Sequence, residues 1–65
     1  MSGHTYAKVW GLSEDENGQP DYGGLQVNLS NVKVESIAGL LLNKYPVEDI
    51  TIISKEEFES EYGDN

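Results

Sequence analysis

The hydrophobic residues of this chain change their spacing partway along the sequence, and this change constrains the fold more than any other feature. Over residues 25–29 they alternate with polar residues, the period of two that is typical of a half-buried β-strand. From residue 34 they recur every three or four positions, as on one face of a helix. Both patterns in one chain predict a sheet packed by helices, so the expected fold class is α+β.

The first strand is predicted over residues 5–12, which are rich in aromatic and β-branched side chains. If Ala7 and Val9 face the helices, Trp10 is a surface residue, because successive side chains point to opposite faces of a sheet. The face opposite Ala7 and Val9 is expected to carry Tyr6, Lys8, Trp10 and Leu12.

Two further strands are predicted over residues 25–29 and 50–53. The stretch between the first two strands, residues 13–24, contains Asn17-Gly18 and predicts a long hairpin connection, since both residues tolerate a positive φ.

A helix is predicted from Val34 to Tyr45. Ser30 and Asn31 are the two candidates for its N-cap. Pro46 is expected to end it, because a proline ring disfavours helical backbone at the residue before it.

Gly39 lies inside this helix and costs about 1 kcal/mol relative to alanine, which predicts a close approach of the helix to the sheet. A second, shorter helix is expected to begin at a capping box formed by Ser54 and Glu57. Phe58 and Tyr62 lie four residues apart, on one face of that helix.

The expected order is therefore β-β-α-β-α, a single small acidic domain over residues 1–65 with a folded core of about 5–62 and a loose tail at 63–65. The sheet should have three mostly antiparallel strands packed by two helices. A right-handed crossover from the second strand to the third would place the first strand in the centre. Without cysteine, neither a disulfide nor a thiolate metal site can stabilise it.

Twelve acidic residues against four lysines and no arginine give a formal net charge of −8. Such a surface disfavours binding to nucleic-acid phosphates and to anionic lipid headgroups. The first twelve residues lack the basic start and apolar run of a signal peptide, and no apolar run approaches the roughly 20 residues that span a bilayer. A cytoplasmic location is therefore expected.

Neither catalysis nor a cofactor is expected. His4 is the only histidine, and without cysteine or arginine the usual nucleophile–base pairs and anion clamps cannot be assembled. The segment 14–21 offers oxygen ligands, but counting from Asp15 places Pro20 and Gln26 where an EF-hand needs glycine and glutamate. A solvated hairpin tip is the preferred interpretation, with a weak divalent-cation module as a third alternative.

Acidic side chains gather in two places, which are the candidate contact sites for a partner. Glu57 and Glu61 are four residues apart on one helix face, and Glu61 lies near the end where negative charge opposes the helix dipole. A simply solvated helix face is the alternative explanation. The candidate acids are Glu14, Asp15, Glu16, Asp21, Glu56, Glu57, Glu59 and Glu61, and the candidate aromatic anchors are Tyr6, Trp10 and Tyr22.

The expected function is a non-enzymatic interaction protein whose acidic surface binds a basic groove on another protein. Its most specific form is an inhibitor that presents carboxylates where nucleic-acid phosphates would lie. The alternative is a small structural or assembly subunit that self-associates, for example as a homodimer through a sheet edge, with its acidity serving solubility. Salt should weaken the first kind of binding and leave the second unchanged.

Overall fold

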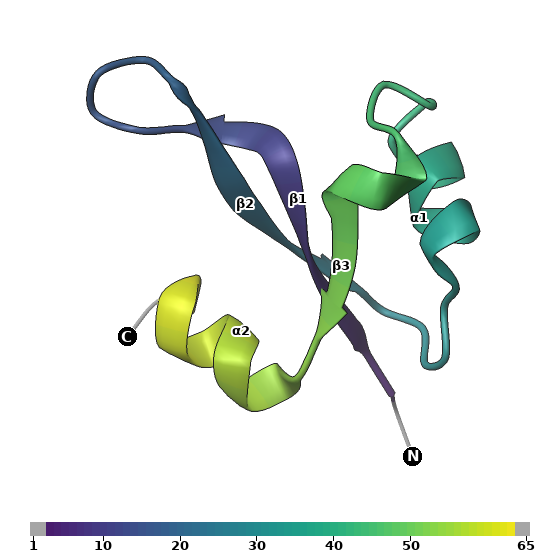
Figure 1. Cartoon of the computed structure of the whole chain (residues 1–65). Helices are drawn as coiled ribbons and strands as arrows, with labels where there is room; N and C mark the ends of the chain where they lie inside the picture. The colour runs from purple at the N-terminus through teal and green to yellow at the C-terminus, as the bar shows by residue number, and fades with distance from the viewer. Residues whose placement is uncertain (1–2, 64–65) are drawn as a thin grey trace.

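The computed structural model describes residues 3–63 of the 65-residue chain. The three strands form one antiparallel sheet in the order β2-β1-β3, which confirms both the predicted α+β class and the central place of the first strand (Figure 1). Of the predicted loose tail, residues 64 and 65 lie outside the described residues. The elements are β1 (Thr5–Glu14), β2 (Pro20–Val27), α1 (Val34–Leu40), the 3₁₀ helix η1 (Val47–Asp49), β3 (Ile50–Ile53) and α2 (Lys55–Glu61).

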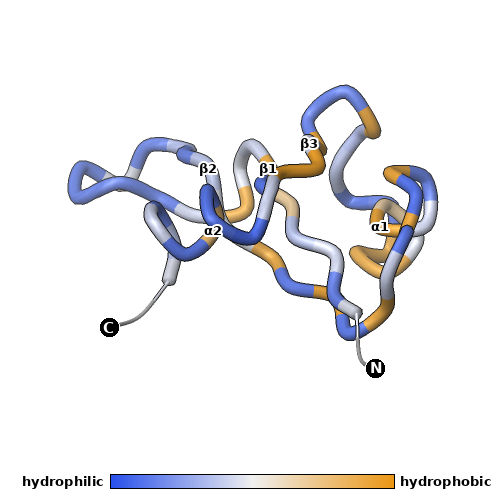
Figure 2. The backbone as a smooth tube through the Cα atoms, turned by 90° about the horizontal axis from the view of Figure 1, so that it is seen from below, coloured by the Kyte–Doolittle hydropathy of each residue, from blue (hydrophilic) through white to orange (hydrophobic). Residues whose placement is uncertain are grey.

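The two helices lie on opposite faces of the sheet. On one face, Ala7 and Val9 of β1 are fully buried against α1, and on the other α2 packs over Tyr6. Figure 2 shows that hydrophobic segments gather where α1, β1 and β3 meet, whereas the hairpin tip is hydrophilic. The core consists of Ala7, Val9, Val27, Ile37, Ala38 and Ile50.

A bulge in β1 changes which side chains share a face. Between Trp10 and Ser13, β1 carries two residues that have no partner in β2, and Gly11 adopts a φ of +89°, in the left-handed region that favours glycine. The bulge interrupts the alternation, so that Leu12 packs against the core. The prediction that Leu12 shares a face with Trp10 is therefore wrong.

The hairpin tip is shorter than predicted, because β1 and β2 extend well into the expected connection. The amide of Asp15 donates to the carbonyl of Gln19 at 2.9 Å, and the amide of Gly18 donates to the carbonyl of Asp15 at 3.0 Å. Gly18 has a φ of +78°. This pattern is a type I turn followed by a glycine in the left-handed region, a common three-residue hairpin loop.

α1 ends well before the predicted Pro46, at Leu40. The amides of Asn43 and Leu42 donate to the carbonyls of Ala38 and Gly39, respectively, while Leu42 adopts a φ of +60°. These two bonds form a Schellman motif, which terminates the helix. The predicted end is therefore wrong, and Pro46 instead caps η1.

α1 begins at Val34, as predicted, after a connection that is held by Thr5. Its hydroxyl donates to the carbonyl of Leu29 at 2.8 Å and accepts from the amide of Val32 at 3.2 Å, which holds the incoming chain beside β1. The N-cap is Lys33, without a side-chain cap bond, and neither Ser30 nor Asn31 takes that role.

Gly39 does not approach the sheet, contrary to the prediction. It is exposed, and a Cβ placed on it would meet no atom within 4 Å, because α1 turns its opposite side, with Ile37 and Ala38, toward the core.

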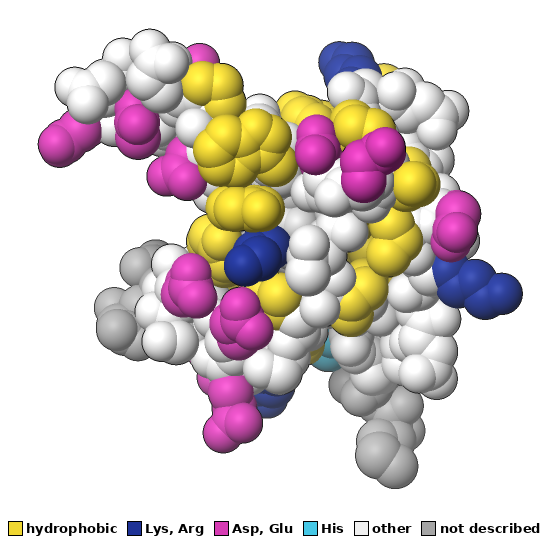
Figure 3. Space-filling model, in the orientation of Figure 1, with side chains coloured by type: hydrophobic (Ala, Val, Ile, Leu, Met, Phe, Trp, Pro, Cys, Tyr) yellow, Lys and Arg dark blue, Asp and Glu magenta, His cyan; other side chains and the backbone are white. Residues whose placement is uncertain are grey.

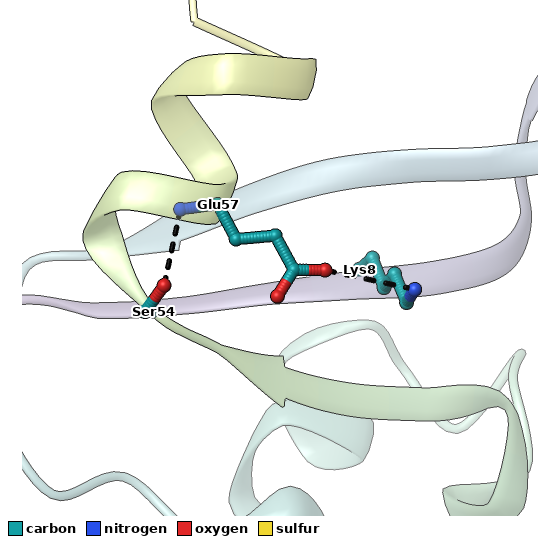
Figure 4. A network of polar contacts seen from close by, with 3 residues as sticks. All are labelled: Lys8, Ser54 and Glu57. Carbon is teal, nitrogen blue, oxygen red and sulfur yellow. Dashed lines mark hydrogen bonds and ion pairs between the residues drawn. The ribbon is translucent and has the colours of Figure 1, made fainter.

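β3 has the predicted bounds, and α2 begins as expected at Ser54, whose hydroxyl accepts from the amide of Glu57 at 3.0 Å (Figure 4). The other half of the predicted capping box differs, because the Glu57 carboxylate reaches across to Lys8. Phe58 and Tyr62 share one face, with ring centroids 6.0 Å apart. Within residues 3–63 no helix is long and apolar enough to cross a membrane.

Candidate functional site

α2 covers only part of its face of the sheet. Phe58 packs on Tyr6 with ring centroids 4.8 Å apart, and Tyr62 lies over Gly24. A Cβ on Gly24 would come within 2.6 Å of the Tyr62 ring, so this close approach requires glycine. Tyr6, one of the predicted aromatic anchors, is therefore half-buried beneath the helix.

Beyond α2 the same face of the sheet is uncovered, and the other two predicted aromatic anchors lie there. Trp10 and Tyr22 are paired across β1 and β2, with ring centroids 5.0 Å apart in an edge-to-face arrangement of 71°. They are 43% and 40% exposed. The sequence predicted that Trp10 would be a surface residue if Ala7 and Val9 faced the helices. Ala7 and Val9 do face the core, and Trp10 is exposed. We call Trp10 and Tyr22 the aromatic surface.

Lys8 lies beside the aromatic surface and contacts it. Its Nζ is 4.8 Å from the centroid of the Tyr22 ring, within cation–π range, and 3.9 Å from Oε2 of Glu57 (Figure 4). The second distance exceeds the roughly 2.7–2.9 Å of a tight charge-assisted hydrogen bond, so the ammonium group is weakly held. The sequence placed Lys8 on this face without assigning it a role.

Acidic side chains flank the aromatic surface on two sides (Figure 3). Figure 3 shows acidic groups on the projecting hairpin and on α2, with exposed hydrophobic side chains and a basic group between them. Seven of the eight predicted acids are exposed and Glu57 is half-buried. In the hairpin they are Glu14, Asp15, Glu16 and Asp21, and in α2 they are Glu56, Glu57, Glu59 and Glu61.

Glu48 and Asp49 of η1 form a third acidic group, which the sequence analysis did not select. η1 contacts β1, and Figure 3 shows acidic side chains over η1 on the opposite side of the exposed hydrophobic group from the hairpin. The sequence could have indicated this group, because Glu48 and Asp49 come just before β3. Since β3 pairs with β1, the residues that precede β3 lie close to β1. We call the acids of the hairpin, α2 and η1 together the acidic rim.

The charge of the acidic rim acts on Tyr62. Burial raises the pKa of the Tyr62 phenol, and the nearby carboxylates of Glu61, Asp21 and Glu57 raise it further. Asp21 belongs to β2, whereas Glu57 and Glu61 belong to α2. The fold therefore brings acids from the hairpin and from α2 within electrostatic reach of one group.

Asp15 has a structural role within the hairpin. Its Oδ1 accepts hydrogen bonds from the amides of Asn17 and Gln19, both at 2.9 Å, and so stabilises the turn. Across residues 3–63, no three His, Cys, Asp or Glu side chains converge to hold a metal ion. The weak cation module stays an untested alternative.

The site therefore joins an exposed aromatic pair to a surrounding group of carboxylates (Figure 3). No family model matches this chain, and searches of curated proteins and of solved structures find no match.

Proposed function

We propose that this chain is a non-enzymatic interaction protein that binds a basic surface of another protein through the acidic rim and the aromatic surface. The observation that carries this proposal is the exposed Trp10–Tyr22 pair with carboxylates from three separate elements around it. Tryptophan and tyrosine often supply the central binding energy of an interface. Surrounding charge accelerates association with an oppositely charged partner and makes it sensitive to salt.

In the more specific form of the proposal, the protein is an inhibitor that occupies a nucleic-acid site on its partner. Glu57 and Glu61 lie one turn apart on α2, which spaces their attachment points by about 6 Å along one side. A basic groove that attracts backbone phosphates attracts such carboxylates for the same electrostatic reason. A cytoplasmic location belongs to this proposal, because a cysteine-free chain suits a reducing compartment.

Charge reversal on α2 tests the proposal. The first step is capture of partners from a native-source extract at two ionic strengths, followed by binding measurements with the purified partner. We expect the double variant Glu57→Lys with Glu61→Lys to lose binding. Because Glu57 is half-buried and lies 3.9 Å from Lys8, the free energy of unfolding of the double variant is measured as well and should fall by no more than about 1 kcal/mol.

A matched pair of single variants controls for net charge. Glu61→Lys lies on the acidic rim, whereas Glu35→Lys makes the same charge change on the exposed side of α1. Glu61→Lys should weaken binding much more than Glu35→Lys. Equal effects, or binding that does not weaken at high salt, would contradict the proposal.

Exposed leucines favour one other candidate function, the self-associating subunit. Leu29, Leu40 and Leu42 are 65%, 62% and 74% exposed, and the first two line a shallow groove beside α1. The outer edges of β2 and β3 are also unpaired within the described chain. Sedimentation at low and high salt tests this alternative: a salt-independent dimer supports it, and a monomer at all concentrations removes it.

A further inference from the structure

The aromatic surface already holds one cation, the ammonium group of Lys8. This group lies 4.8 Å from the Tyr22 ring centroid and 3.9 Å from Oε2 of Glu57. We propose that in the complex an arginine side chain of the basic partner takes this place, and that Lys8 occupies it in the free protein and is displaced on binding. The inference rests on the proposed function and names the side chain that the partner inserts.

The charges around the aromatic surface select a cation as its occupant. Every charged side chain in the hairpin tip, in η1 and in the described part of α2 beyond Lys55 is a carboxylate. The whole chain has a formal charge of −8. An anionic segment would be repelled, and an apolar segment would remove nearby carboxylates from water without replacing their hydrogen bonds. A cationic side chain satisfies both the ring faces and the carboxylates.

The geometry further favours arginine over lysine in the partner. A guanidinium group is planar, so it can stack on an aromatic ring and still donate two hydrogen bonds to one carboxylate. It is also more weakly hydrated than an ammonium group, and less hydration is lost when it binds. Trp10 and Tyr22 offer the exposed ring surface, and Glu57 offers the carboxylate beside it.

Lys8 can leave this place without disturbing the core. It lies on the face of β1 opposite Ala7 and Val9, and its partners there, Tyr22 and Glu57, retain solvent exposure. A long lysine side chain can keep its aliphatic part on the sheet while its ammonium group moves into water. The displaced cation is therefore an internal competitor for the partner's arginine.

The test uses a blocked tetra-arginine peptide as the probe and Trp10, the only tryptophan, as the fluorescent reporter. Lys8→Gln removes the internal competitor, and we expect the peptide to bind about two- to fivefold tighter. Lys33→Gln makes the same change in net charge at the N-cap of α1, which packs on the opposite face of the sheet. This control should bind less than about twofold tighter, because salt screens distant surface charges.

Two comparisons complete the experiment. Tyr22→Leu should weaken peptide binding about threefold or more through loss of the ring, and a tetra-lysine peptide should bind the wild-type protein more weakly than tetra-arginine does. Equal gains from Lys8→Gln and Lys33→Gln, or weaker binding by Lys8→Gln, would overturn the inference.

The same experiment separates this inference from the proposed function. Binding that is weakened by salt and by Glu61→Lys, but that is insensitive to both Lys8→Gln and Tyr22→Leu, would refute the arginine site and leave the acidic interaction surface standing. No peptide binding by any variant at low salt would refute both.

Discussion

Replacement of Thr5 by valine should destabilise the fold although it keeps the shape of the side chain. Thr5 is 6% exposed, and its hydroxyl bonds to the carbonyl of Leu29 and the amide of Val32, at 2.8 and 3.2 Å. Valine offers neither a donor nor an acceptor there. Both backbone groups belong to the connection between β2 and α1, so the substitution loosens the attachment of that connection to β1.

The size of the effect follows from the burial of these bonds. A buried backbone group left without a partner costs about 1–3 kcal/mol. Both bonds are only partly buried, so we use about 1 kcal/mol for each and expect a total loss of about 2 kcal/mol. A 65-residue domain has a total stability of roughly 3–10 kcal/mol, so this loss is a large share of it.

Urea unfolding followed by Trp10 fluorescence measures this loss. With a slope of about 1 kcal/mol per molar urea for so small a domain, the unfolding midpoint should fall by about 2 M. Thr51→Val, at an exposed position of β3, is the matched control and should change stability by less than about 0.5 kcal/mol. Thr5→Ser keeps the hydroxyl and should lose less than Thr5→Val. A Thr5→Val midpoint equal to that of Thr51→Val would refute the reasoning.

Two glycines and one tyrosine provide further predictions for the free energy of unfolding. Gly24→Ala would place a Cβ within 2.6 Å of Tyr62 and should destabilise by about 1–3 kcal/mol in urea unfolding, whereas Gly39→Ala, with open space around it, should stabilise by up to about 1 kcal/mol. Similar changes in the free energy of unfolding for Gly24→Ala and Gly39→Ala would contradict the packing of α2 on the sheet. The pKa of Tyr62 is raised in the folded state, so the neutral phenol stabilises the fold. This contribution to the free energy of unfolding is fully present below the unfolded pKa of about 10 and is lost as the pH rises through the folded pKa. Tyr62→Phe should therefore lose less stability than the wild type between pH 9 and pH 12, and equal losses would show that Tyr62 is not the group responsible.

Features that depend on a few neighbouring residues could be predicted from the sequence. β3 has the predicted bounds, and the Ser54 hydroxyl caps α2 as its spacing from Glu57 indicates. The hairpin was expected from Asn17-Gly18, and Gly18 adopts a positive φ whereas Asn17 does not. The cap and the turn depend on hydrogen bonds that span no more than about four residues, and β3 was indicated by its run of β-branched side chains.

The errors arose where a distant or unusual backbone contact decided the outcome. α1 stops early because Leu42 enters the left-handed region, which the helical spacing of the apolar residues did not indicate. Its N-cap is Lys33 rather than the predicted Ser30 or Asn31, and Thr5, which lies 27 residues before Val32 in the chain, holds the connection that leads into the helix. Leu12 reached the core through the bulge at Gly11, since a bulge shifts the strand's alternation.

The sequence by itself therefore determined the order of elements, the α+β class and the acidity of the surface, because periodicity, caps and charge are local or additive properties. Tertiary structure alone decided that the Trp10–Tyr22 pair is uncovered and that Lys8 rests against it. It also decided that acids from the hairpin, α2 and η1 surround this pair. The physical reason is that strand pairing and helix packing join residues far apart in the chain, and no local pattern records which surface they leave open.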